Sequence, residues 1–137
     1  MEDEVEGAAK APMTPAAALL GRRFLRYDRE TSEATLAYFA PPEFANRHGS
    51  VQGGLLSAML DSAAGAVVLM ELPPDHTVVT LRLDTVFLRP APLGSLTVVA
   101  RTAAREGRDV MVEAEIVTDA GVVLTRATVR MRILQRS

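Results

Sequence analysis

The chain has 137 residues, of which 48% are hydrophobic, 23% charged and 4% aromatic. This length fits one folded domain and leaves no room for a second fold with its own core. A net charge of −2 and the absence of cysteine exclude a general attraction to nucleic acid or anionic lipid, a disulfide framework and a zinc site built on thiolates.

The N-terminal residues predict a flexible tail and not a targeting signal. Residues 1–13 are acidic and contain Ala and Pro without periodicity, and they lack an apolar core of signal-peptide length. The longest apolar stretch, around Ala63 to Met70, is too short to span a bilayer. We therefore expect a tail over residues 1–13, one domain over residues 14–137 and a cytoplasmic location.

Helix and turn signals divide the domain into one short helix, one long helix and six strands. Thr14 is suited to the N-cap and Pro15 to the first position of a short helix that Gly21 ends. The mostly apolar stretch from Gly53 to about Met70 contains no proline and predicts the main helix, buried on most sides. Strand-like runs cover residues 22–28, 34–39, 77–88, 95–104, 110–118 and 122–134.

The order of these elements predicts an α+β fold. The first two strands form a hairpin, the main helix follows, and the last four strands are interpreted as an antiparallel meander joined by short turns. A sheet with one apolar face needs a cover, and the main helix is the only long candidate. We expect one antiparallel sheet wrapped around one long central helix.

Two glycines at the start of the main helix are candidates for a ligand site. Gly53 and Gly54 follow the polar loop from Asn46 to Gln52. Glycine lets a ligand approach the backbone closely, and first-turn N–H groups present donors and a partial positive charge to an oxygen. The alternative is that the glycines only form a tight turn.

Asp61 stands inside the apolar helix, where a carboxylate has poor propensity and costs free energy if it is buried without a partner. It shares a helix face with Ser57. That face is either solvated, as for most helical acids, or it holds a general base or nucleophile. On the strand 77–88, Thr80, Arg82 and Asp84 alternate with apolar residues, a pattern typical of the outer face of a half-buried strand.

Segment 46–54, which reads Asn-x-x-Gly-x-x-Gln-Gly-Gly, and Asp61 together resemble the hotdog-fold acyl-CoA thioesterases of the phenylacetic-acid-degradation (PaaI-like) type. Their motif is Asn-x-x-Gly-x-x-His-Gly-Gly, with an acid seven residues beyond the last glycine. The resemblance extends through strand 79–90 and the basic hairpin 105–108, and covers roughly residues 20 to 134. It implies a hotdog fold and a homodimer, often paired again into a homotetramer, with active sites at the subunit interface.

The resemblance also implies catalytic roles. The Gly53 N–H would polarise the thioester carbonyl and stabilise the oxyanion, and Asp61 of the other subunit would act as general base or nucleophile. Asn46 would hold the water or the thioester, and Thr80 would help to position water. Gln52 departs from the commonest motif, which has His there; an amide can orient a group but cannot change charge near neutral pH.

The acyl-CoA substrate would meet further residues. The acyl group would lie between the helix and the sheet of the partner subunit, and arginines would contact the phosphates of CoA. Candidates for substrate and CoA binding are Gly54, His48, Arg89, Arg105 and Arg108. Coenzyme A enters only as part of the substrate, and two histidines without cysteine predict no metal site. Aryl, short-chain and medium-chain acids, on CoA or on acyl carrier protein, all fit.

Three other functions compete with this hypothesis. A non-catalytic acyl-CoA-binding hotdog domain would not need Asp61. A hotdog dehydratase or hydratase typically brings an Asp/His or His/Glu pair, and no such spacing stands beside Asp61. A scaffolding protein leaves the glycine loop and the helix acid unexplained.

Overall fold

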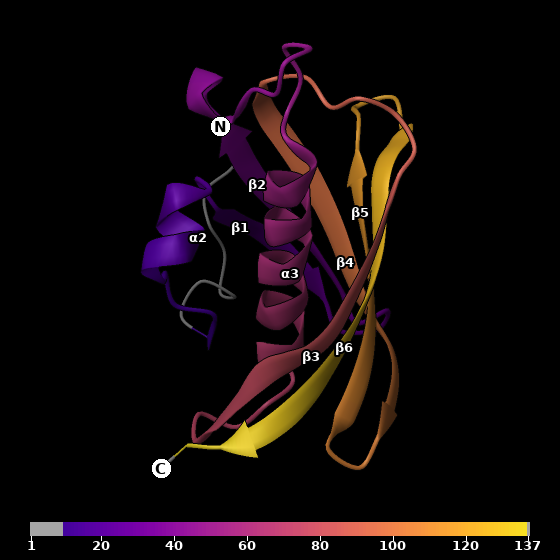
Figure 1. Cartoon of the computed structure of the whole chain (residues 1–137). Helices are drawn as coiled ribbons and strands as arrows, with labels where there is room; N and C mark the ends of the chain where they lie inside the picture. The colour runs from indigo at the N-terminus through magenta and orange to yellow at the C-terminus, as the bar shows by residue number, and fades with distance from the viewer. Residues whose placement is uncertain (1–9, 137) are drawn as a thin grey trace.

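The computed structural model describes residues 10–136, which form one six-stranded antiparallel sheet and one long helix (Figure 1). This confirms the predicted α+β hotdog architecture, and a short 3-10 turn in the loop before the long helix was not predicted. In chain order the elements are α2 (Pro15–Leu19), β1 (Arg23–Asp28), β2 (Glu33–Ala40), η1 (Pro42–Phe44), α3 (Gly53–Leu69), β3 (His76–Phe87), β4 (Gly94–Glu106), β5 (Asp109–Val117) and β6 (Val123–Gln135).

The strand order is β1-β2-β4-β5-β6-β3, which corrects the predicted four-strand meander. Only β4, β5 and β6 form a meander, because β3 pairs with β6 and lies at the far edge of the sheet. The connection between β3 and β4 contains Pro90 and Pro92, which cannot donate to a strand ladder. It crosses over the end of the molecule where α3 begins (Figure 1).

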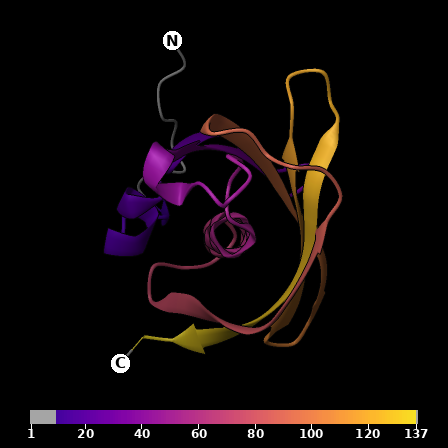
Figure 2. The same cartoon turned by 45° about the horizontal axis from the view of Figure 1, so that its top comes forward.

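Viewed down its axis, α3 lies inside the curl of the sheet (Figure 2). Alternate residues of the strands point inward and are buried, among them Leu36, Val98 and Val112, and they pack with Leu60 and Ala64 of α3. Burying one such Val or Leu side chain contributes roughly 1.5–3 kcal/mol. Within residues 10–136, no helix is long and apolar enough to cross a membrane.

The short helix α2 covers one side of α3 (Figures 1 and 2). Its predicted N-cap is confirmed, since the Thr14 hydroxyl accepts a hydrogen bond from the Ala17 N–H at 3.1 Å. Gly21 ends the segment with φ +67°, and a Cβ there would lie 2.9 Å from the Phe39 Cβ, so only glycine fits.

The tail predicted over residues 1–13 lies largely outside the described residues. Of its last residues, Ala11 is buried with 3% exposure. The Arg22 guanidinium donates to the carbonyl of Ala11 at 2.7 Å and to that of Pro12 at 3.0 Å. Ala11 and Pro12 are therefore held in place beside α2 by the Arg22 side chain.

Candidate active site

The loop before α3 is held in shape by Asn46. Its side-chain oxygen accepts hydrogen bonds from the backbone N–H of His48 at 2.8 Å and of Ser50 at 3.2 Å, and its amide nitrogen donates to the Ser50 hydroxyl at 3.1 Å. Gly49 closes this turn with φ +82°. Asn46 thus fixes the backbone that leads into the helix start, and both ends of its amide are engaged within the loop.

The start of α3 presents unpaired backbone donors. Gln52 is the N-cap residue, and its exposed side chain makes no capping hydrogen bond. The N–H groups of Gly53 and Gly54 have no acceptor among residues 10–136. A Cβ on Gly53 would lie 3.2 Å from the Phe87 ring, whereas a Cβ on Gly54 would meet nothing within 4 Å. The backbone at Gly54 is open to a ligand, in line with the positive end of the helix dipole.

Four of the predicted site residues meet at this helix start. Asn46, His48, Gly53 and Arg89 line one hollow of about 510 Å³, together with the ring of Phe87. A donor pair at a helix N-terminus beside an arginine suits an anionic or polarised oxygen. Phe87 was not predicted as a site residue, although it begins the Phe-x-x-Pro pattern that ends the strand in the resemblance.

Asp61 is half-buried and contacts β3. The Thr80 hydroxyl donates to Asp61 Oδ1 at 2.6 Å. The neighbouring Ser57 hydroxyl donates to the Thr85 hydroxyl at 3.0 Å, so the shared face of Ser57 and Asp61 lies against β3. Asp61 Oδ2 accepts no hydrogen bond from the residues that the structure describes. The carboxylate is therefore oriented by one bond and keeps one oxygen for a substrate or water.

A β-bulge explains how Thr80 reaches Asp61. The pairing of β3 with β6 shifts register between Thr80 and Arg82, and Thr80 lies opposite the buried Met131 on the inner face. Arg82 and Asp84 point outward, where they form a 2.7 Å ion pair. The expected outer-face pattern holds for those two residues and fails for Thr80, because the extra residue of a bulge changes the side on which later side chains emerge.

The remaining predicted residues lie elsewhere. Arg105 and Arg108 sit at the β4–β5 hairpin, at the end of the molecule opposite the helix start and Arg89 (Figure 1). Arg105 donates to the Gly107 carbonyl at 3.1 Å. One copy of the chain therefore brings Arg89 to the helix start and keeps Arg105 and Arg108 away from it.

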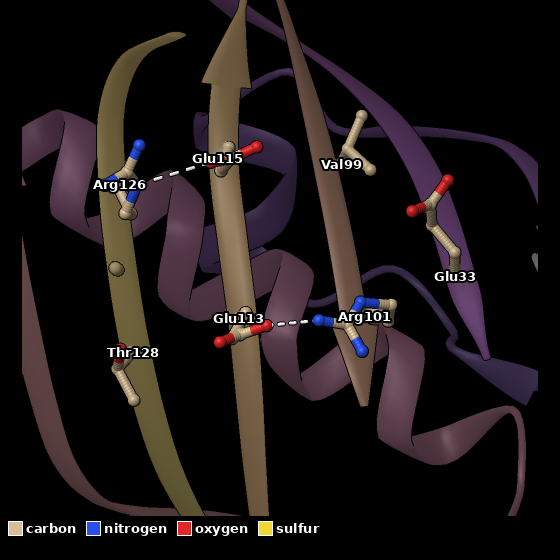
Figure 3. A pocket seen from close by; sticks show the side chains of 8 residues that line it. Glu33, Val99, Arg101, Glu113, Glu115, Arg126 and Thr128 are labelled. Carbon is tan, nitrogen blue, oxygen red and sulfur yellow. Dashed lines mark hydrogen bonds and ion pairs between the residues drawn. The ribbon is translucent and has the colours of Figure 1, made fainter. Parts of the chain in front are cut away.

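Another hollow, on the outer face of the sheet, has most of its charges paired (Figure 3). Arg101 forms an ion pair with Glu113 on the neighbouring strand, and Arg126 lies 3.3 Å from Glu115. These acids and bases neutralise one another across strands, as is typical of a solvated sheet face. Within residues 10–136, no group of three or more His, Asp or Glu side chains could hold a metal ion.

Large apolar side chains are exposed along β3 at the free edge of the sheet. Val79, Leu81 and Val86 are 42%, 46% and 54% exposed. An exposed apolar edge strand invites pairing with another strand unless charge or a covering segment protects it. This edge borders the Asp61–Thr80 pair, since Thr80 belongs to the same strand.

Comparison with known proteins yields a family model, described as the Thioesterase superfamily, that matches residues 48–125. A phenylacetic acid degradation-related protein from Ralstonia eutropha JMP134, proposed to be a thioesterase, is 33% identical with a TM-score of 0.84, over 91% of this chain and 96% of that one. AziG of S. sahachiroi is 29% identical (TM-score 0.80; 89% and 98% covered). The E. coli PaaI protein shares the fold at 19% identity (TM-score 0.80; 95% and 97% covered). No curated protein matches.

Proposed function

This chain belongs to the Thioesterase superfamily, and from that premise we propose that it hydrolyses the thioester of an acyl-CoA, with the helix start polarising the carbonyl and Asp61 activating water. The observation that carries the proposal is that α3 has two kinds of functional group: open N–H donors at Gly53 and Gly54, and a half-buried carboxylate that Thr80 orients. Such a pair supplies both needs of thioester hydrolysis, an oxyanion site and a base.

The spacing of these groups favours a site shared by two copies of the chain. Gly53 and Asp61 are eight positions apart on α3, which corresponds to about 12 Å along the helix axis. Both groups must come within about 3 Å of one reacting carbonyl and its attacking water. The proposal therefore takes Gly53 from one subunit and Asp61 from its partner.

The reaction then proceeds in two steps. Asp61 takes a proton from water while the water oxygen bonds to the carbonyl carbon, and the N–H of Gly53 stabilises the resulting oxyanion. The tetrahedral intermediate collapses, the C–S bond breaks, and the proton held by Asp61 passes to the departing thiolate. Direct attack by Asp61 to give a mixed anhydride is the alternative. Single-turnover hydrolysis in ¹⁸O water tests it, because water that opens the anhydride at the Asp61 carboxyl carbon leaves the label in Asp61 and none in the acid, whereas water activated by Asp61 places one ¹⁸O in the acid.

The assembly we propose is a homodimer, paired again into a homotetramer. The apolar edge of β3 supports it, because antiparallel pairing of two β3 strands would cover Val79, Leu81 and Val86. The same two-fold pairing brings the end that carries Arg89 in one subunit beside the end that carries Arg105 and Arg108 in the other. These arginines are proposed to contact the phosphates of CoA, and His48 and Gly54 to line the entrance. The cytoplasmic location stays a prediction.

Thiol release from aryl-, short- and medium-chain acyl-CoAs tests the proposal, with Asp61→Asn as the decisive variant. Asparagine keeps the shape and removes the base, so we expect a folded oligomer whose kcat/KM falls by at least about a hundredfold. If the native protein binds acyl-CoA and releases no thiol from any of them, the chain is a non-catalytic acyl-CoA-binding domain.

A further inference from the structure

A second hollow opens directly beside Asp61 and runs under α2. It has a volume of about 460 Å³ and is bounded by α3 on one side, by α2 on another and by the start of β3 on a third. Asp61 and Thr80 border it. The side chains that form most of its wall are small or aliphatic, among them Ala17, Leu20, Ala58, Ala66 and Val78.

Most polar side chains around this hollow, apart from Thr77, are already bonded within the chain. The Ser62 hydroxyl accepts a hydrogen bond from the Tyr38 hydroxyl at 3.0 Å, and the Thr14 hydroxyl caps α2. The Arg22 guanidinium donates to two backbone carbonyls, and Arg136 donates to the Pro74 carbonyl at 3.1 Å. The wall beyond Asp61 therefore suits an unsubstituted hydrocarbon better than a group with polar substituents.

The length of the hollow sets the size of that hydrocarbon. It follows α3 from Asp61 to Leu69, eight positions or about 12 Å along the helix axis. An extended chain advances about 1.2 Å per bond, so this length corresponds to roughly eight to ten carbons. A phenylacetyl group or a butanoyl chain would leave the far half empty.

Two residues of α3 limit the hollow. At Gly65 an added Cβ would lie 3.7 Å from the Met131 Cε and 4.0 Å from the Val78 Cγ2, an ordinary contact, so a side chain that extends past Cβ would enter the hollow. Leu69 stands at its far end. It also borders a smaller hollow of about 170 Å³ lined by Leu72, Pro73 and His76 among others, so Leu69 stands between the two together with Pro12 and Arg136, which line both.

From these observations we propose that the hollow under α2 is the acyl channel, that it selects straight acyl chains of medium length, and that Gly65 and Leu69 set the length limit. The inference rests on the proposed thioesterase function and deepens it by naming the substrate class. The thioester carbonyl lies at Asp61, and the chain follows α3 toward Leu69 of the same subunit.

Two opposite substitutions test the channel in the full-length oligomer, with kcat/KM measured for acyl-CoAs from acetyl to hexadecanoyl and for phenylacetyl-CoA. Gly65→Leu fills the channel, so the kcat/KM for octanoyl- and decanoyl-CoA falls at least about tenfold relative to that for acetyl-CoA, because one methylene in an apolar pocket already changes selectivity about tenfold or more. Leu69→Ala opens the smaller hollow and shifts the best chain length upward. Gly65→Ala is the matched control, since it changes the helix propensity of the position and adds only a methyl group.

The outcomes separate the two proposals. Absence of thiol release from every acyl-CoA by the native protein overturns the thioesterase function itself. Thiol release with a native preference for phenylacetyl- or butanoyl-CoA, or with the same chain-length profile in Leu69→Ala as in the native protein, overturns the channel and leaves the function standing. Thermal melting and size-exclusion chromatography check that each variant is folded, and Leu69→Ala alone decides the matter if Gly65→Leu does not fold.

Discussion

The 2.6 Å hydrogen bond from Thr80 to Asp61 fixes which carboxylate oxygen faces the reaction. Thr80→Val keeps the shape of the side chain and removes the donor, so Asp61 becomes free to rotate. We expect kcat/KM to fall between about tenfold and a hundredfold, because misplacing a catalytic group by about 1 Å has effects of that size. Thr128→Val, on the exposed face of β6, is the control. An equal loss in both variants would contradict a positioning role for Thr80.

The N–H of Gly53 can be removed with little change to the helix. Proline is tolerated at the first helical position, and the Gln52 backbone, at φ −57° and ψ 132°, already has the extended conformation that a residue before proline adopts. Gly53→Ala places the same Cβ against the Phe87 ring and keeps the N–H. We expect kcat/KM of Gly53→Pro to lie about 10²- to 10³-fold below that of Gly53→Ala. Equal activity in the two would exclude this N–H as an oxyanion donor.

Candidate site residues could be identified from the sequence where the signal lay in the neighbouring residues. A carboxylate within an apolar helix and two glycines at its start were identified because each conflicts with what packing alone requires. The partner of Asp61 was not derivable from alternation, which grouped Thr80 with Arg82 and Asp84. The bulge that separates them depends on pairing with β6, a contact between residues about fifty positions apart.

The strands β5 and β6 are tied together near the β4–β5 hairpin by Asp109 and Arg132. The hydrogen bond from Arg132, 2.8 Å long, holds the pKa of Asp109 below its ordinary value. A carboxyl with a lowered folded-state pKa stabilises the fold above its unfolded value of about 3.9, and this contribution disappears as pH falls through the folded-state pKa.

Melting temperature measured from neutral pH down into the acid range tests this linkage. Asp109→Asn should melt below the native protein at neutral pH, and the two curves should converge in acid; added salt should narrow the gap because both side chains are exposed to solvent. Asp119→Asn, in the exposed turn after β5, is the control. If the difference in melting temperature between Asp109→Asn and the native protein does not change with pH, the substitution acts through packing and not through the charge of Asp109.

The helices and strands were predictable because hydrophobic period and turn residues are local signals. The order of the strands in the sheet was not predictable in the same way, because it depends on contacts between distant parts of the chain. The last four strands were expected to pair in sequence, yet β3 pairs with β6 at the edge of the sheet and not with β4. The apolar helix explains the difference: a sheet that curls around α3 needs a strand on each side of it, and the proline-containing connection after β3 lets the chain cross over.

At the scale of the whole molecule, the candidate site is divided. One copy of the chain places the helix start and Arg89 in one hollow and Asp61 with Thr80 in another. The sequence named nearly all of these residues, but the distance between them is a property of helix geometry, and the surface that would unite them is the apolar edge of β3. The site is therefore complete only if two copies combine.

Subunit mixing tests this arrangement directly. Gly53→Pro and Asp61→Asn should each form a dimer with two defective sites. A heterodimer of the two places both defects in one site and leaves the other intact, so random reassociation, with half of the dimers mixed, should restore about a quarter of native activity. The measurement is thiol release after the two variants are co-expressed, or unfolded and refolded together, compared with each variant treated alone. A mixture no more active than its parents would show that Gly53 and Asp61 act within one subunit or that one of them has no role in the reaction.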